Sequence, residues 1–318
     1  MNYDLTEMLG FARPAGNVYE EAFIDKYIRS VNGIEEDAYG NLIVDVGHFP
    51  LVLWSSHTDT VANRGGMQEV LNIKGKLQLT FGDKMAGKKR RPSCLGADCT
   101  TGVWIMLNMI KEGRPGRYIF HRNEENGGWG SDFIAKKRPD LLQGVNHAIA
   151  FDRKGYHDVI THQSWQRTAS DKFADALAQK LGMGYRKSEH GMFTDTDNYK
   201  RIVPECTNIS VGYDRQHTID EIQDLDFAKK LLDKLLSTDF QDLPTVRDPS
   251  VYQYRGAYTS SNSYGAFNGY TAYQQFLRMN ADYIDEMLTD MGIDEDIVRL
   301  YVAKQKGKVT NKDLYDMQ

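Results

Sequence analysis

His57 and Asp59 lie one residue apart in the segment WSSHTDTVANRGG, which overlaps the end of the apolar run LVLW. A short apolar run that gives way to polar residues and glycine is typical of a buried strand that has just ended. A histidine that binds a metal commonly has a carboxylate beside it that orients the ring. The pair therefore predicts a metal ligand with its orienting group, or, as the simpler alternative, a solvated loop after a strand.

Four more acids and a second histidine lie where other predicted strands end or helices begin. In an open parallel sheet the loops at the carboxyl ends of the strands converge, and sites form there. We therefore expect these side chains to meet at one edge of the sheet. Glu124 and Glu125 follow YIFHRN, Asp152 follows AIAF, His217 lies beyond NISVGYDRQ, and Asp98 lies in LGADCTTG, in the turn that opens a helix.

Metal binding is the chemistry that such a group favours. Two adjacent carboxylates such as Glu124 and Glu125, at the end of a buried strand, repel each other and lose hydration unless a cation lies between them. Two histidines with several carboxylates form a mixed nitrogen and oxygen set that suits Zn²⁺, and also Mn²⁺ or Co²⁺. The acids exceed what one ion needs, which suggests two ions about 3.5 to 4 Å apart that share one bridging aspartate.

Helical and strand patterns alternate from the start of the chain to about residue 240. Strands separated by helices, several of them continuous apolar runs, predict an α/β fold with a mostly parallel central sheet and helices on both faces. A hairpin is expected near residues 70–92. Helices are expected at 17–31, 100–113, 131–138, 170–182 and 225–237, and strands at 41–47, 50–56, 117–122, 145–151 and 206–212.

The chain of 318 residues is longer than a single core usually supports, so we expect a main domain with an appendage. We place the catalytic domain at 1–240. Residues 241–275 are rich in Tyr, Ser and Gly without a period, which predicts a flexible linker or, alternatively, an arm that packs on a neighbouring subunit of a homo-oligomer. Residues 276–318 show short amphipathic patterns that predict a small helical tail.

Composition excludes several classes of protein. No apolar stretch approaches the roughly 18 residues that span a bilayer, and the first residues do not resemble a secretory signal. A net charge of -5 argues against nucleic acid as a partner, and the basic run GKKRR at 87–91 is typical of a solvated loop. Three cysteines form a sparse, odd set that suits free thiols, so we expect a cytoplasmic protein.

Five segments together resemble the co-catalytic di-zinc exopeptidases, which comprise the zinc aminopeptidases and the related carboxypeptidases and deacylases. The resemblance covers roughly residues 1–240 and follows the family's order. The segments are HTD at 57–59, GADCTTG at 96–102, EENGGWGS at 124–131, FDR at 151–153, and His217 within GYDRQHTIDE.

The resemblance implies two Zn²⁺ ions per chain, with Asp98 as the bridge between them. It makes His57 and Asp152 ligands of one ion, and Glu125 and His217 ligands of the other. It also implies a cis peptide bond between residues 98 and 99.

The resemblance further assigns the two remaining acids. Asp59 would be the carboxylate that orients His57, and Glu124, beside a ligand but not bound, would be the general base. The metals would lower the pKa of a water, and the base would take its proton.

Two departures from the family bear on the reaction. Cys99 stands where many relatives carry a second acid, which changes the electrostatics beside the metals. Only 64 residues separate Asp152 from His217, too few for the extra domain of the deacylase and carboxypeptidase branches, so the single-domain aminopeptidase branch is favoured. Asp195 and Thr196 fall in the segment that shapes the substrate pocket in relatives, where they would contact a substrate amine or backbone; capping a turn is the alternative.

The expected activity is hydrolysis of a peptide or amide bond, most consistent with an aminopeptidase acting on a small peptide. An amidohydrolase that acts on an N-acyl amino acid is the first alternative. A non-catalytic binding module on the same fold is the second, but it gives no reason to keep Glu124 together with the ligand set.

Overall fold

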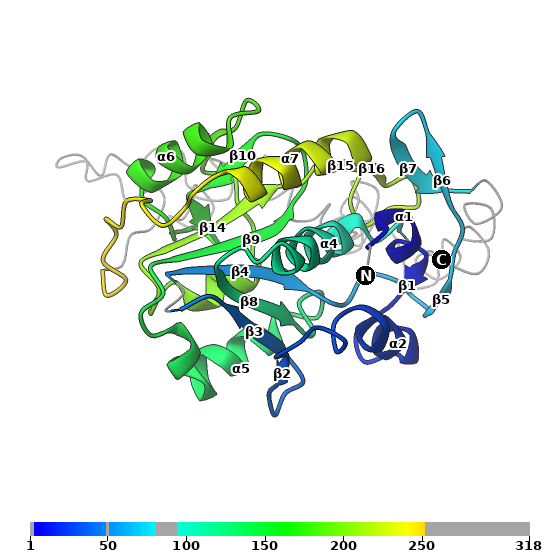
Figure 1. The fold of residues 1–318 in the computed structure, drawn as a ribbon, viewed down its shortest axis with the longest axis horizontal. Helices are drawn as coiled ribbons and strands as arrows, with labels where there is room; N and C mark the ends of the chain where they lie inside the picture. The colour runs from blue at the N-terminus through cyan, green and yellow to red at the C-terminus, as the bar shows by residue number, and fades with distance from the viewer. Residues whose placement is uncertain (1–2, 49–50, 81–93, 252–318) are drawn as a thin grey trace, which may run out of the picture. The chain divides into compact units, whose positions relative to one another are not determined.

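A mixed sheet of eight strands forms the centre of the protein, in the order β13-β10-β14-β9-β4-β8-β3-β2 (Figure 1). The computed structural model describes residues 3–48, 51–80 and 94–251. The strands are β2 (Glu35–Glu36), β3 (Leu42–Val46), β4 (Val52–His57), β8 (Gly116–His121), β9 (His147–Arg153), β10 (Asp158–Ile160), β13 (Arg186–Ser188) and β14 (Glu205–Ser210).

The four central strands β14, β9, β4 and β8 run parallel to one another. Antiparallel strands flank them, with β10 beside β14 on one side and β3 beside β8 on the other. The α/β class and the mostly parallel sheet are therefore confirmed. Parallel strands end at the same edge, so the carboxyl ends of β4, β8 and β9 lie together, which is the arrangement that the predicted site needs.

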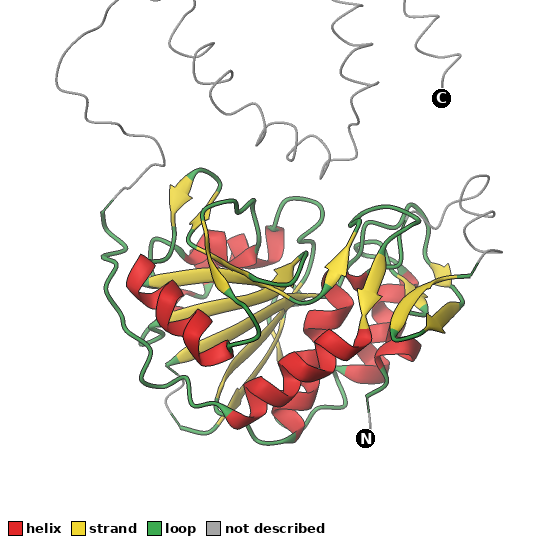
Figure 2. Ribbon diagram, turned by 90° about the horizontal axis from the view of Figure 1, so that it is seen from above, coloured by secondary structure: helices red, strands yellow, loops and turns green. Residues whose placement is uncertain are grey.

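Alternation along the strands divides the interior into two cores. Successive side chains of a strand point to opposite faces, and accordingly Trp54 and Tyr118 belong to one cluster of buried residues while Leu53 and Ile119 belong to the other. The first cluster also receives side chains from α2, α4, α6 and α7, and the second from α5. Seen from above, helices lie on both sides of the sheet (Figure 2).

Capping side chains mark the starts of several helices, and a glycine marks the end of one of them. Asn17, Ser170 and Asp224 accept backbone N–H groups at the starts of α2, α6 and α7, which are ordinary side-chain caps. Gly182 ends α6 with a φ of 61°, a conformation that glycine adopts at little cost. The helices are α1 (Leu5–Met8), α2 (Val18–Tyr27), α4 (Ala97–Lys111), α5 (Trp129–Lys137), α6 (Asp171–Leu181) and α7 (Leu225–Ser237), with 3-10 turns η1 (Pro139–Leu142) and η2 (Asp195–Tyr199).

Helix α4 lies directly on the backbone of the sheet. A Cβ atom on Gly102 would come within 2.2 Å of the Phe151 carbonyl oxygen and 2.2 Å of Ser56 Oγ. Only a glycine at this position allows the helix to approach β4 and β9 so closely. The start of α4 is thereby held over the ends of those two strands.

Smaller sheets lie beside the central one. A four-stranded sheet has the order β15-β16-β7-β6, and its β6–β7 hairpin confirms the prediction for the start of segment 70–92. Residues 81–93, with the basic run at 87–91, lie outside the described residues. The strands are β6 (Val70–Ile73), β7 (Lys76–Leu79), β15 (Tyr213–Asp214) and β16 (Ile222–Asp224), and the two-stranded pairs are β1 (Phe11–Ala12) with β5 (Gly66–Met67) and β11 (His162–Gln163) with β12 (Gln166–Arg167).

The segment after α7 packs against the main body as far as the structure describes it. Leu243 is buried, and the Arg247 guanidinium donates to the backbone oxygens of residues 200, 203 and 204. These residues therefore are not a free spacer. The predictions for the rest of the 241–275 arm and for the 276–318 tail lie outside the described residues.

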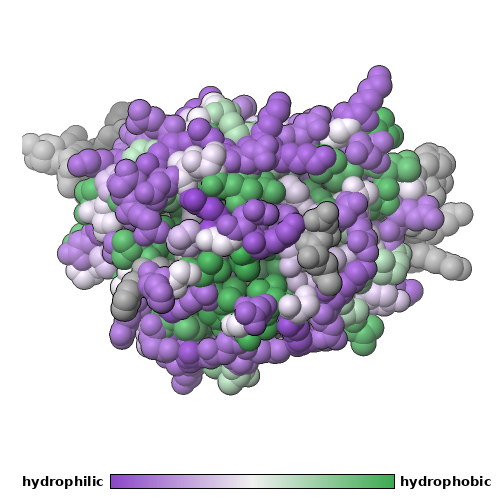
Figure 3. Space-filling model, in the orientation of Figure 1, coloured by the Kyte–Doolittle hydropathy of each residue, from purple (hydrophilic) through white to green (hydrophobic). Residues whose placement is uncertain are grey.

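Figure 3 shows one face of the molecule, on which hydrophilic residues predominate and apolar patches lie between them. None of the helices in the described ranges has the length and apolar character needed to cross a membrane.

Candidate metal centre

The predicted ligands lie on five separate pieces of the fold. His57 is the last residue of β4, Asp152 lies near the end of the neighbouring parallel strand β9, and Asp98 lies in the first turn of α4. Glu125 follows β8, and His217 lies in the loop between β15 and β16. The close packing of α4 on the sheet brings these pieces to the same edge.

His57 contacts two of the predicted ligands through one ring nitrogen. Its Nε2 lies 3.0 Å from Asp98 Oδ1 and 3.3 Å from Asp152 Oδ1. The other nitrogen, Nδ1, lies 3.0 Å from the backbone oxygen of Asp59 and 3.5 Å from its carboxylate. Asp59 thus orients the ring mainly through its carbonyl group, whereas its carboxylate is the more distant partner.

Asp98 joins the two halves of the cluster. Its second oxygen, Oδ2, lies 3.2 Å from His217 Nε2, and Glu125 Oε2 lies 3.4 Å from the same nitrogen. One carboxylate therefore stands between the two histidines, each on a different side. This is the position that a bridging aspartate requires.

Glu124 lies at the edge of the cluster. Its Oε2 is 4.0 Å from His57 Nε2, farther than the carboxylates of Asp98 and Asp152. The backbone N–H groups of Glu124 and Glu125 both donate to the carboxylate of Asp59, at 3.2 and 3.1 Å. Asp59 therefore fixes the turn that carries both glutamates.

Three buried carboxyl groups of the cluster have raised pKa values. Burial raises the pKa of Asp152 to about 7, and the charge of Asp98 adds to that shift. Burial likewise raises the pKa of Glu124 and of Glu125. The charges of His57 and His217 lower the pKa values of these acids but do not offset burial, so burial favours the protonated acids.

The histidines and the bridging aspartate shift in the opposite sense. Burial acts to lower the pKa of His217, but the charge of Glu125 and the hydrogen bond to Asp98 outweigh it and raise the pKa. Burial acts to raise the pKa of Asp98, but its hydrogen bonds to His217 and His57 hold it well below its usual value. The imidazolium groups thus occupy the role of counter-ions.

The donor set fits a divalent cation. His57, Asp98 and Glu125 each offer one donor atom, and these atoms lie within 4.8 Å of one another. His57, Cys99 and Asp152 form a second such group. Imidazole and carboxylate donors suit Zn²⁺. Both groups contain His57, and neither contains His217.

Several residues that the sequence does not predict support the cluster. Thr194 Oγ1 donates to Asp152 Oδ2 at 2.6 Å, and Asn208 donates to the same oxygen at 3.3 Å. The buried Arg13 donates to the Thr58 carbonyl and to Thr100 Oγ1, so that it ties the loop after β4 to α4. Nothing in their local sequence marks these residues, because their partners are far away along the chain.

Asp195 and Thr196 lie in the interior, in η2. Asp195 Oδ2 is 3.2 Å from His121 Nδ1, but neither carboxylate oxygen has a hydrogen-bond partner of good geometry. Thr196 Oγ1 lies 3.2 Å from the carbonyl oxygen of Thr207, to which it donates. Their predicted contacts with a substrate stay predictions.

The peptide bond between Asp98 and Cys99 is cis, as predicted. Cys99 is buried, with Sγ 3.1 Å from the Phe151 carbonyl oxygen, and burial raises the pKa of its thiol. A thiol that keeps its proton is a poor nucleophile.

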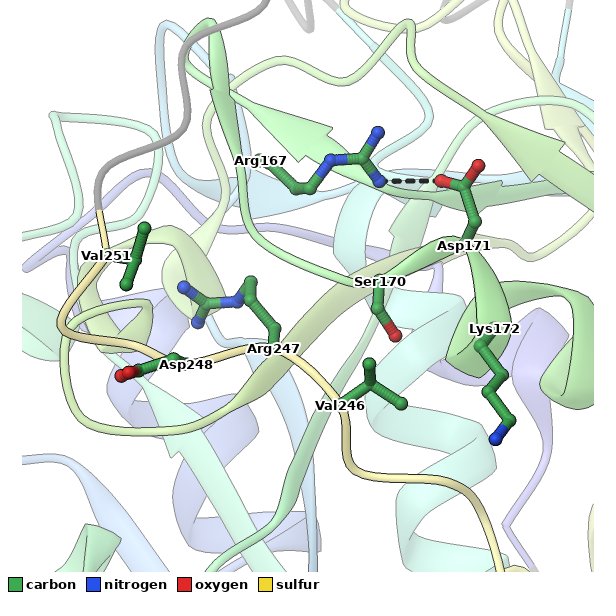
Figure 4. A pocket seen from close by; sticks show the side chains of 8 residues that line it. All are labelled: Arg167, Ser170, Asp171, Lys172, Val246, Arg247, Asp248 and Val251. Carbon is green, nitrogen blue, oxygen red and sulfur yellow. Dashed lines mark hydrogen bonds and ion pairs between the residues drawn. The ribbon is translucent and has the colours of Figure 1, made fainter.

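A separate pocket of about 470 Å³ opens beside the start of α6 (Figure 4). Its walls include Val246 and Val251 and an ion pair between Arg167 and Asp171, whose Nη1 and Oδ1 atoms are 2.6 Å apart. None of the predicted site residues lines it, so it is distinct from the metal centre.

Comparison with known proteins supports the fold. No protein-family model matches the sequence, and no curated protein matches it. Aminopeptidase PepT from Bacillus cereus ATCC 10987 and a tripeptidase from Staphylococcus aureus subsp. aureus Mu50 each align over 73% of this chain and 95% of their own, at 13% identity and a TM-score of 0.58.

A third solved structure, the TET1 peptidase of Pyrococcus horikoshii, aligns over 70% of this chain and 94% of its own, at 18% identity and a TM-score of 0.50. Identities this low establish a common fold only. The predicted resemblance is thus confirmed at the level of architecture: the chain has the fold of the PepT and TET aminopeptidases.

Proposed function

We propose that this protein is a di-metal hydrolase, most consistent with an aminopeptidase that uses two Zn²⁺ ions to cleave the first peptide bond of a small peptide. The observation that carries the proposal is the meeting of two histidines and three carboxylates at one sheet edge, with Asp98 between the histidines. The shared fold with solved aminopeptidases supports it.

In this proposal the chain divides the ligands between two ions. His57 and Asp152 would hold one ion, Glu125 and His217 the other, and Asp98 would contact both. When bound, the metals would lower the pKa of a water molecule and polarise the scissile carbonyl.

Glu124 would act as general base. It is close to His57 but lies outside the tightest contacts, so its carboxylate is free of the ligand role. Its raised pKa, caused first by burial, suits a group that takes a proton from water and later gives it to the leaving amine. The Asp59 carboxylate would keep this glutamate in place through the backbone N–H.

A panel of aminoacyl anilides and N-acyl amino acids tests the proposal. Zinc-reconstituted protein should release aniline from the former, a chelator should abolish the activity, and Glu124→Ala should reduce kcat by about 100-fold to 10,000-fold. Cleavage of N-acyl amino acids alone would establish the amidohydrolase instead. Fewer than one zinc ion per chain after reconstitution would favour a binding module without catalysis.

Assembly and location remain part of the proposal. The Pyrococcus horikoshii TET1 peptidase is described as assembling into a tetrahedron or a large octahedral shell. We propose a homo-oligomer for this chain as well, located in the cytoplasm, with no nucleic-acid partner. Light scattering of the full chain would test the first point, and cell fractionation the second.

A further inference from the structure

Glu221 is a buried acid that the proposed reaction does not use. It follows His217 by four residues, in the loop between β15 and β16, and its side chain is inaccessible to solvent. A buried acid destabilises the fold unless its oxygens accept hydrogen bonds.

The carboxylate of Glu221 reaches the start of α4, more than a hundred residues away. Its Oε2 accepts the N–H of Gly96 at 2.8 Å, and its Oε1 faces the N–H of Asp98 at 3.4 Å. The first N–H groups of a helix lack partners within the helix and need an outside acceptor. Glu221 supplies that acceptor to the residues that carry the bridging carboxylate.

No side chain at the start of α4 itself accepts these N–H groups. The residue before the helix is Gly96, which has a φ of 77° and makes no side-chain cap. A Cβ atom there would come within 2.9 Å of Thr60 Cγ2, so a capping serine or asparagine does not fit. The cap must therefore come from elsewhere in the fold.

Glu221, which caps α4, lies in the same loop as His217, and His217 contacts Asp98 at the start of that helix. Asp98 Oδ2 lies 3.2 Å from His217 Nε2, and Glu221 belongs to the loop that carries this histidine. The Glu221 side chain therefore ties the backbone that carries Asp98 to the loop that carries His217. Resting on the di-metal function proposed above, we infer that Glu221 is a positioning residue, which holds Asp98 and His217 at the spacing that a shared divalent cation needs.

The test measures zinc affinity, ion by ion, together with the thermal stability of the metal-free full-length protein. Glu221→Asp keeps the negative charge but draws it back by one methylene group, out of reach of the Gly96 N–H. We expect the affinity for one of the two zinc ions to fall by about 10-fold to 100-fold, as for other groups that orient metal ligands. Glu221→Gln keeps the length and should cause a smaller fall.

Glu205 provides a matched control. It is equally buried, and its carboxylate accepts the backbone N–H groups of Ser170, Val246 and Arg247. It lies at the start of β14, paired with His147 at the start of β9, whereas Asp152 is near the other end of β9. Glu205→Asp should lower the melting temperature and leave both zinc affinities unchanged.

The outcomes separate the inference from the proposed function. Wild-type protein that binds no zinc would overturn both. If the wild type binds two zinc ions and the zinc affinities of Glu221→Asp lie within twofold of the wild-type values, only the positioning role is overturned. The same holds if zinc affinity falls in Glu221→Gln but not in Glu221→Asp, because that result would mean that charge alone matters. If Glu221→Asp does not fold, Glu221→Gln is compared with Glu221→Ala, which removes the acceptor as well as the charge. A positioning role predicts the larger loss of zinc affinity in Glu221→Ala, and equal zinc affinities in these two variants would refute the inference.

Discussion

The carboxylate of Asp59 accepts the backbone N–H of Glu124, with Oδ1 3.2 Å from the nitrogen. Its other oxygen accepts the N–H of Glu125. One buried acid therefore holds the residue proposed as base and a residue proposed as ligand in a single turn. The same residue contacts His57 through its backbone oxygen.

Asp59→Asn should impair both the turn and the zinc centre. The amide keeps one acceptor oxygen, but its NH₂ group faces a backbone N–H that then lacks a partner, which destabilises folding by about 1 to 3 kcal/mol. We expect zinc affinity to fall by about 10-fold to 100-fold. Calorimetry and a chelator competition would measure the two effects.

Asp37→Asn is the control for that change. Asp37 accepts three backbone N–H groups in a turn that holds no predicted ligand. It should lower stability without altering zinc affinity. Equal zinc affinity in Asp59→Asn and the wild type would show that Asp59 has a structural role alone.

Thr194→Val should weaken zinc binding with little change in packing. The substitution keeps the shape of the side chain but removes the hydroxyl that donates to Asp152 Oδ2 at 2.6 Å. Without that donor the Asp152 carboxylate is held by the longer bond from Asn208, at 3.3 Å, and we expect a zinc dissociation constant about tenfold higher. Thr207→Val, which removes a buried hydroxyl donating to Ile160, is the matched control and should bind zinc normally.

The metal-free protein should lose stability as the pH rises. Asp152 and Glu221 have pKa values of about 7 and about 8 when folded, whereas unfolded carboxyl groups titrate near pH 4. The folded state therefore binds more protons between those limits, and its melting temperature should fall from about pH 4 to about pH 8. The raised pKa of His217 acts in the same direction above about pH 6.5.

Zinc should reverse that trend. The ligands must lose their protons before they bind the ion, so the stabilisation by zinc increases with pH. Melting curves with chelator and with zinc, recorded across this range, would show the two slopes. A metal-free protein whose stability rises from pH 5 to pH 8 would contradict the electrostatic account, and Asp152→Asn should flatten its slope.

Gly102→Ala should displace α4 and disturb the site at a distance. The added methyl group would meet the Phe151 carbonyl and Ser56 Oγ, and such overpacking costs about 1 to 3 kcal/mol. Because Asp98 lies four residues earlier on α4, zinc affinity should fall together with stability. Gly113→Ala has open space around it and tests whether the loss of a glycine alone is responsible, although its φ of 67° adds local strain.

The sequence predicted the site best where local pattern and sheet topology coincide. His57 and Asp152 follow apolar runs that form neighbouring parallel strands, and the rule for strand ends places them together. The contact between Asp98 and His217 is harder to predict from the sequence, because tertiary packing brings the loop of His217 to α4. The spacing of residues along the chain does not predict that contact.

The supporting contacts lay beyond sequence reasoning for a related reason. Glu221 stands within the segment HTIDE, four residues after a predicted ligand, yet its acceptor role depends on a backbone N–H of Gly96. Thr194 is adjacent to Asp195, a predicted substrate contact, but it is Thr194 that contacts a predicted ligand. The type of a residue shows whether its side chain can donate or accept a hydrogen bond, whereas the fold determines which residue is its partner.

The close approach of α4 to β4 and β9 at Gly102 affects which substitutions the interior can accept. Where a helix rests on sheet backbone, as α4 does on the Phe151 carbonyl, the geometry above it depends partly on main-chain atoms, which every amino acid shares. Side chains elsewhere in the interior can then be exchanged over evolutionary time, provided that volume is conserved, without shifting Asp98 relative to the strands. Residue 102 itself is not exchangeable in this way, because any side chain there would meet the Phe151 carbonyl oxygen and Ser56 Oγ.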